Sequence, residues 1–171
     1  MKKKLIIIAG LGAAWVAAYA TSSTANGAID SQAAFSRLKT LTGEWEANSS
    51  MGKVHESFES IAGGTALVER ETSEHMPPMQ TVYHLDGNRL LLTHYCALGN
   101  QPRMQANAYN ASTGALSFAF LDATNLASPG AGHMHNAGYQ FADSNHFPAS
   151  WELFENGKKK TTETVQFTRV R

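Results

Sequence analysis

Short runs of alternating apolar and polar residues follow one another along most of the chain, starting near residue 44. We interpret ten of these runs as strands, at 44–48, 54–60, 65–72, 81–85, 89–97, 103–109, 115–121, 133–142, 149–154 and 161–170. A period of two places successive side chains on opposite faces of a strand. The pattern therefore predicts an all-β protein of about ten strands.

Turn residues separate these runs. Asp86-Gly87 and Asn156-Gly157 each stand between two strand-like runs, and such dipeptides favour tight hairpins because both positions tolerate left-handed backbone angles. We interpret Lys158 to Lys160, which follow one of these dipeptides, as part of a solvated turn. Near-regular strand spacing without a βαβ rhythm favours an antiparallel up-and-down barrel or a strongly curved sheet.

One segment before the strands has helical periodicity. Phe35 and Leu38 lie three residues apart on one predicted face, and Asp30 or Ser31 can cap the first turn. We therefore expect one short N-terminal helix that ends near residue 40.

The first twenty residues have the composition of a secretory signal peptide. Lys2 to Lys4 precede 15 apolar or small residues, and Ala18 and Ala20 are the small residues that signal peptidase requires. A membrane span needs roughly 20 apolar residues, so an uncleaved anchor is the less favoured alternative. We expect export to the periplasm or the extracellular space, with no stable membrane insertion after cleavage. The expected division of the chain is a signal peptide at 1–20, a disordered leader at 21–28 and a barrel domain at 29–171.

The charge balance argues against one class of partner. Removal of the three signal-peptide lysines from the 14 basic residues leaves 11 basic residues against 14 acidic ones. Lys158 to Lys160 is the remaining run of basic residues. Because nucleic-acid binding requires a basic surface, we expect no nucleic-acid partner.

Several segments resemble known proteins. Leu41-Thr-Gly-Glu-Trp45, after a predicted helix, resembles the entry to lipocalin-like barrels, where a Gly-x-Trp lies on the first strand and plugs one barrel end. The count of ten strands without a closing helix resembles the nitrobindin-like haem-binding barrels. Segment 83–104 and His133-Met-His135 are similar to secreted bacterial proteins of unassigned function. These resemblances imply a carrier of small apolar molecules or, as in nitrobindins, haem held by one histidine.

Two pairs of side chains could form a metal site. His94 and the only cysteine of the chain, Cys96, share one face of a predicted strand, and His133 and His135 share the more apolar face of another. The two pairs can converge if the strands curve around a barrel, with Met104 nearby in sequence. Imidazole and thiolate ligands suit Zn²⁺ or Cu, and a thioether favours copper. Haem is a less favoured alternative.

The same residues support a second interpretation, as the polar part of a small-molecule cavity. Arg103 could bind a ligand carboxylate at the barrel mouth, although an arginine there is also typical of a solvated surface. Buried histidine and cysteine are also common as purely structural residues. The candidate ligand-binding set is His94, Cys96, Arg103, Met104, His133, His135 and Tyr139.

A thiol-dependent enzyme is the third interpretation. Cys96 would be the nucleophile, with His94 or His133 as its base and Asp86 or Glu69 to orient the base. No predicted helix N-terminus near them supplies an oxyanion hole, so the sequence favours binding over catalysis. We therefore expect an exported protein that binds a small, apolar ligand, with metal or haem binding as the alternative.

Overall fold

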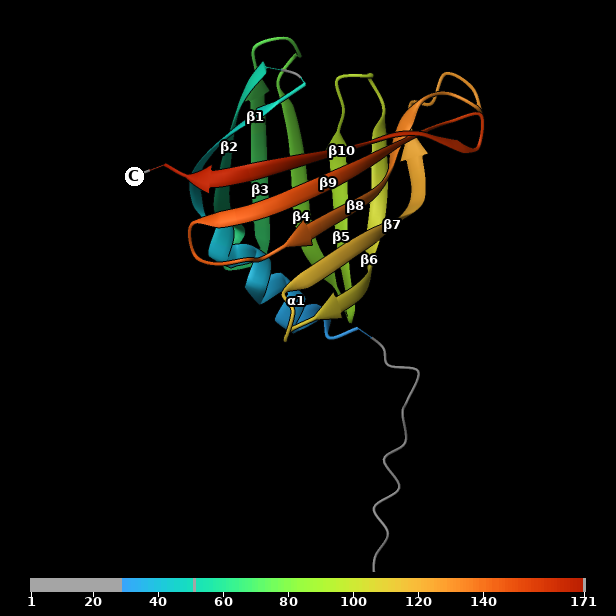
Figure 1. The fold of residues 1–171 in the computed structure, drawn as a ribbon. Helices are drawn as coiled ribbons and strands as arrows, with labels where there is room; N and C mark the ends of the chain where they lie inside the picture. The colour runs from blue at the N-terminus through green and yellow to red at the C-terminus, as the bar shows by residue number, and fades with distance from the viewer. Residues whose placement is uncertain (1–28, 51, 171) are drawn as a thin grey trace, which may run out of the picture.

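The protein is a closed barrel of ten antiparallel strands (Figure 1). The computed structural model describes residues 29–50 and 52–170, so the predicted signal peptide and leader lie outside the described residues. Each strand pairs with its neighbours in sequence, and β1 pairs with β10 to close the barrel. The strands are β1 (Gly43–Ser49), β2 (Gly52–Ile61), β3 (Ala66–Ser73), β4 (Met79–Asp86), β5 (Arg89–Tyr95), β6 (Gln101–Asn110), β7 (Ala115–Thr124), β8 (His133–Gln140), β9 (His146–Glu155) and β10 (Lys158–Arg169). This architecture confirms the predicted all-β barrel and agrees with a lipocalin-like barrel.

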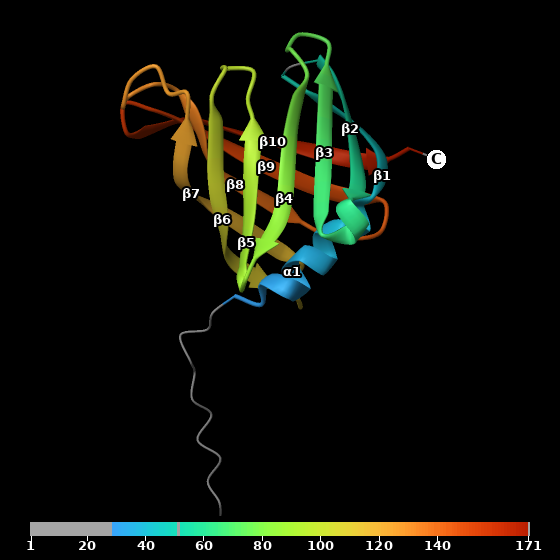
Figure 2. The same cartoon turned by 180° about the vertical axis from the view of Figure 1, so that it is seen from behind.

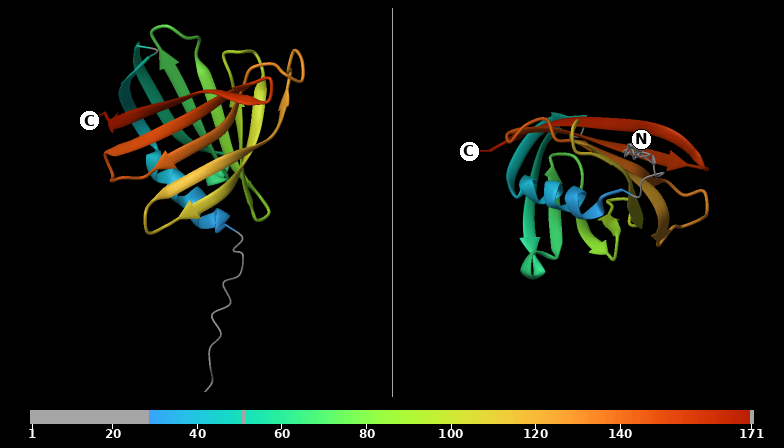
Figure 3. Two further views of the ribbon diagram at one scale, coloured as in Figure 1. Left: turned by 45° about the vertical axis from the view of Figure 1, so that its right-hand side comes forward. Right: turned by 90° about the horizontal axis from the view of Figure 1, so that it is seen from below.

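One short helix covers one end of the barrel. α1 (Ser31–Leu38) continues into a 3₁₀ turn, η1 (Lys39–Leu41), and a second 3₁₀ turn, η2 (Ala62–Gly64), joins β2 to β3. Asp30 caps α1, because its carboxylate accepts a hydrogen bond from the Ala33 amide at 2.9 Å. Seen from below, α1 crosses the barrel end (Figure 3). Within the described residues, no helix is long and apolar enough to cross a membrane.

Trp45 and Arg169 join the helix end to the closing pair of strands. The fully buried Trp45 indole donates a hydrogen bond to the Leu41 carbonyl at 2.7 Å. The Arg169 guanidinium lies 4.0 Å from the Trp45 ring centroid, and it donates hydrogen bonds to the carbonyls of Thr40 and Thr42. A cation over an indole face is favourable, so Arg169 covers the tryptophan that the resemblance placed at the barrel end.

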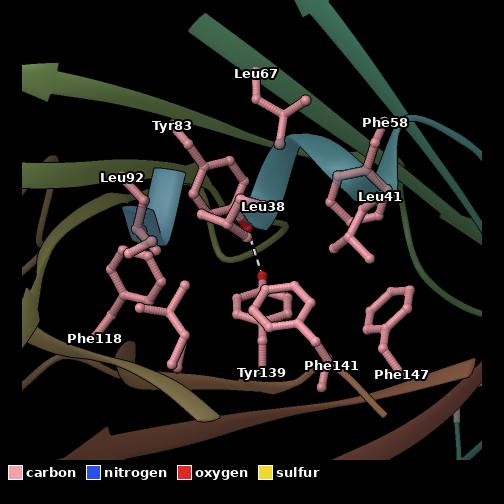
Figure 4. Close-up of a cluster of buried hydrophobic side chains, with 14 of the residues drawn as sticks. Leu38, Leu41, Phe58, Leu67, Tyr83, Leu92, Phe118, Tyr139, Phe141 and Phe147 are labelled. Atoms are coloured by element: carbon pink, nitrogen blue, oxygen red, sulfur yellow. Dashed lines mark hydrogen bonds between the residues drawn. The ribbon is translucent and has the colours of Figure 1, made fainter. Parts of the chain in front are cut away.

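The apolar core lies between α1 and the middle of the barrel. Leu38 and Leu41 contribute from the helical segment, and aromatic rings from opposite walls meet them (Figure 4). Trp45 and Phe147 pack edge to face with centroids 4.7 Å apart, a favoured arrangement of aromatic rings. Tyr83 and Tyr139 reach across this core from β4 and β8, and a hydrogen bond of 2.5 Å joins their hydroxyls. The core of this end is therefore mostly apolar, with one polar contact at its centre.

Two local expectations are corrected. The lysines at 158–160 belong to β10 and not to a turn, because Asn156 and Gly157 alone form the turn, with φ of 53° and 70°. In β8 the pairing with β9 shifts between Met134 and Asn136. Such a bulge inserts one residue and interrupts the period of two. His133 is buried, as the more apolar face predicts, whereas His135 is only partly buried.

Replacing Trp45 with Phe should lower the free energy of unfolding by about 2–3 kcal/mol. The change leaves the buried Leu41 carbonyl without its indole donor and a space beside Phe147. Chemical denaturation measures the loss, and Trp151→Phe in the half-buried wall is the matched control, with a smaller effect. Equal stabilities of the two variants would contradict a special role for Trp45.

Candidate functional site

A cavity of about 270 Å³ lies in the barrel near the end away from α1. Two of its lining residues, Met76 and Leu98, belong to the loops that join β3 to β4 and β5 to β6, at the upper end in Figure 2. Most of the wall is apolar, and a few polar groups interrupt it, as is typical of small-molecule sites. The lining residues are Glu71, Met76, Met79, His94, Cys96, Ala97, Leu98, Met134, Trp151, Leu153, Thr161 and Glu163.

His94 is a buried polar group with one free ring nitrogen in this wall. Its Nδ1 lies 2.9 Å from the Thr81 hydroxyl, and its ring packs against Trp151 with centroids 4.8 Å apart. Nε2 is buried and has no hydrogen-bond partner. Burial lowers the pKa of His94 to about 4, so the ring is neutral at pH 7 and can offer Nε2 to a ligand as a neutral donor or acceptor.

Cys96 lies beside His94 in the cavity wall. Its side chain is buried, with 9% of the residue exposed. Burial is also the main cause that raises the pKa of its thiol, and the nearby Glu71 raises it further. A thiol with a raised pKa carries little thiolate, which is the nucleophilic form. Its burial and its raised pKa therefore disfavour Cys96 as a nucleophile.

Three glutamates extend from the cavity into the barrel interior. Glu56 on β2 pairs directly with Glu71 on β3, and Glu69 lies two residues before Glu71 on the same face. One carboxylate oxygen from each lies within 4.8 Å of one from each of the others. None of the ion pairs formed by the described residues includes them. Burial raises the pKa of all three, to about 7 for Glu69 and Glu71.

The two core tyrosines hold only one of these carboxylates. The Tyr83 hydroxyl hydrogen-bonds Glu69 Oε2, and the Tyr139 hydroxyl lies 3.2 Å from the same oxygen. In contrast, Glu56 Oε2 and Glu71 Oε1 are buried without any hydrogen-bond partner. An unpaired buried polar atom costs about 1–3 kcal/mol. These two oxygens therefore favour a bound group that can pair with them.

His133 and His135 form a separate cluster. His133 Nε2 lies 3.1 Å from His135 Nδ1, and His133 Nδ1 lies 2.9 Å from the Ala131 carbonyl. The His135 ring stacks on Phe120 and Phe154, with centroids 4.6 and 4.0 Å away. Neither histidine lines the cavity; Met134 between them does. Beside the bulge in β8, Met134 therefore faces the cavity in place of its two histidine neighbours.

The structure does not bring the four predicted metal ligands together. His94 and Cys96 share the cavity wall, whereas His133 and His135 bind each other and two phenyl rings. Among residues 29–50 and 52–170, the glutamate trio is the one group of three or more histidine, cysteine or acidic residues with donor atoms close enough for a single ion. The two pairs stay apart because they belong to different parts of the barrel wall. His94 lies on β5 with Cys96 directly after it, whereas His133 and His135 lie on β8.

The remaining candidates also occupy different places. Arg103 is on the outer surface, where its guanidinium binds the Asp122 carboxylate through two hydrogen bonds, one of 2.6 Å. Met104 is fully buried in the apolar core, and Tyr139 belongs to the tyrosine pair described above. None of these three lines the cavity.

Sequence reasoning missed the glutamate trio, although alternation contained a signal. Glu56 stands between Val54 and Phe58 at a spacing of two, and Glu69 and Glu71 continue the face that begins with Leu67. A strand face that combines apolar residues with carboxylates indicates acidic groups inside the barrel.

Comparison with models of known protein families and with curated proteins finds no match for the chain.

Protonation of His94 should destabilise the fold below neutral pH. The unfolded chain takes up this proton near pH 6.5 and the folded protein only near pH 4, so stability present above pH 6.5 is lost as the pH falls toward 4. The loss amounts to at most about 3 kcal/mol. Urea denaturation of wild type and His94→Gln at several pH values measures the contribution of His94 to this loss. The stability advantage of the wild type over the variant should shrink on acidification. A difference that is independent of pH would contradict the buried, neutral imidazole.

Alkylation of Cys96 should be slow in the folded protein. Because the chain has one cysteine, iodoacetamide labelling reports this thiol alone. We expect a rate at least about tenfold lower in the native protein than in denaturant, since burial limits access and the thiolate fraction. Equal rates would instead support the thiol-enzyme interpretation. Mass spectrometry over time measures both.

Proposed function

We propose that this protein binds a small molecule whose apolar body fills the cavity and whose polar group reaches His94 and Glu71. The observation that carries the proposal is an apolar cavity whose wall contains two buried atoms without protein partners, His94 Nε2 and Glu71 Oε1. Buried polar atoms are almost always paired in folded proteins. A ligand in the cavity would supply the missing partners.

The shape and lining of the cavity restrict the ligand. Its volume of about 270 Å³ is near the lower end of the range of roughly 300–1,000 Å³ for sites that hold drug-sized molecules. Trp151 and Leu153 offer flat and branched apolar surface, and Met79 and Met134 add flexible thioethers that adapt to irregular shapes. A hydroxyl or amine can hydrogen-bond both a neutral imidazole and a carboxyl group. We infer a compact, apolar alcohol, phenol or amine.

The sequence also supports a cellular compartment for this proposed binding. The lysine-led apolar segment at residues 1–20 supports export, so binding would take place in the periplasm or outside the cell. The barrel suits such a role, because a closed sheet has no free edge strands through which it could aggregate. The protein would therefore act as an exported carrier or scavenger of its ligand.

Titration with N-phenyl-1-naphthylamine, a neutral probe that fluoresces in apolar surroundings, tests the cavity. We expect saturable binding by the wild type and at least about tenfold weaker binding by Met134→Trp, whose larger side chain occupies the cavity. Leu121→Trp is the matched control, because Leu121 is an exposed apolar residue that does not line the cavity. Unchanged affinity in Met134→Trp would overturn the proposal, as would the absence of saturable binding.

The polar end is tested by two ligands that differ in one hydroxyl. If His94 binds a polar group, 1-naphthol should bind more tightly than naphthalene, and His94→Phe should remove this preference while naphthalene binding persists. The difference expected for one buried hydrogen bond is about 1 kcal/mol, or roughly fivefold in affinity. Calorimetry measures both ligands. An equal preference in wild type and variant would exclude His94 from recognition.

A further inference from the structure

We propose that Glu56, Glu69 and Glu71 form an interior binding site for one divalent cation of the oxygen-preferring class, Ca²⁺, Mg²⁺ or Mn²⁺. The site goes beyond the small-molecule cavity, because Glu56 and Glu69 do not line that cavity. The two sites meet at Glu71, whose carboxyl group belongs to both.

The distances within the trio fit one ion. An oxygen from each carboxylate lies within 4.8 Å of the others. Oxygen ligands lie about 2.0–2.6 Å from Mg²⁺ or Ca²⁺, so two ligands of the same ion are at most about 4–5 Å apart. Strand pairing sets this arrangement, since Glu56 and Glu71 are register partners on β2 and β3. The three groups can therefore contact one ion without a change in the backbone.

The hydrogen bonding of the trio leaves coordination positions free. Glu56 is 2% exposed, and its Oε2 has no partner. Glu71 Oε1 is likewise buried and unpartnered. A carboxylate that merely closed a hydrogen-bond network would have both oxygens paired. These free oxygens are an observation separate from the clustering, and they point to a missing cationic or donor partner.

The residues around the trio orient Glu69, the third ligand, and the chemistry of the ligands determines which kind of ion fits. The Tyr83 hydroxyl hydrogen-bonds Glu69, and the Tyr139 hydroxyl lies 3.2 Å from the same oxygen. Such outer-shell contacts commonly orient a metal-ligating carboxylate. No lysine, arginine or histidine forms an ion pair with the trio among the described residues. A set of carboxylate ligands suits Mg²⁺, Ca²⁺ or Mn²⁺, whereas Zn²⁺ and Cu prefer the imidazole and thiolate groups that lie elsewhere.

Calorimetric titration of the EDTA-treated, dialysed protein with CaCl₂, MgCl₂ or MnCl₂ tests the site. We expect at least one of these ions to bind with a stoichiometry near one and to raise the melting temperature. Glu56→Gln keeps the side-chain shape but removes one ligand charge, and it should weaken binding at least about tenfold. Glu59→Gln is the matched control on the same strand, because Glu59 is exposed and pairs with Arg70; its affinity should equal that of the wild type.

Three outcomes would overturn the cation site: no saturable binding of any of the three ions, unchanged affinity in Glu56→Gln, or equal weakening in Glu59→Gln. Glu71→Gln repeats the test if Glu56→Gln does not fold. Luminescence of Tb³⁺ excited through tyrosine adds a readout of position, since Tyr83 and Tyr139 contact Glu69, and Tyr139→Phe should reduce this luminescence. Binding of N-phenyl-1-naphthylamine by Glu56→Gln should persist, so failure of the cation site and failure of the cavity are distinguishable.

Discussion

The pairing of β1 with β10 is the constraint on which the rest of this structure depends. Closure removes the free edges of the sheet and gives every strand one enclosed face and one exposed face. Trp45 and Arg169 are register partners at this closure. Their stacked side chains also bind the end of η1, so the same contact that closes the barrel attaches the helix that covers its end.

Closure divides the interior into two parts with different chemistry. Near α1 the enclosed side chains are mostly leucines and aromatic rings of the apolar core. Toward the other end the same strands contribute His94, Cys96 and the glutamates, and the cavity opens there. The apolar half supplies most of the buried core that stabilises the fold, and the polar half contains the site that we propose for ligand binding. The tyrosine pair lies at the boundary, with rings in the core and hydroxyls on Glu69.

Burial of three carboxyl groups without a basic partner is costly in a domain of this size. A buried charge is stable only when it is neutralised, paired or bound to a metal. Burial raises the pKa of all three carboxyl groups, which favours their protonated, neutral form and lowers this cost. A hydrogen-bond donor on a ligand at Glu71, or a cation within the trio, would lower the same free-energy cost by pairing with the carboxyl groups. Both proposed sites therefore depend on the burial of these glutamates.

Local pattern alone predicted the strands, the single helix and the all-β class, because hydrophobic period and turn dipeptides act over a few residues. Alternation also grouped His94 with Cys96, and the structure keeps both in one wall. It failed at β8, where one inserted residue moves Met134 to the cavity. Alternation could not show whether the two predicted ligand pairs converge. It also could not show that Glu56 lies beside Glu69 and Glu71. Strand register and barrel curvature decide which distant residues share a point, and these arise only when all ten strands pair.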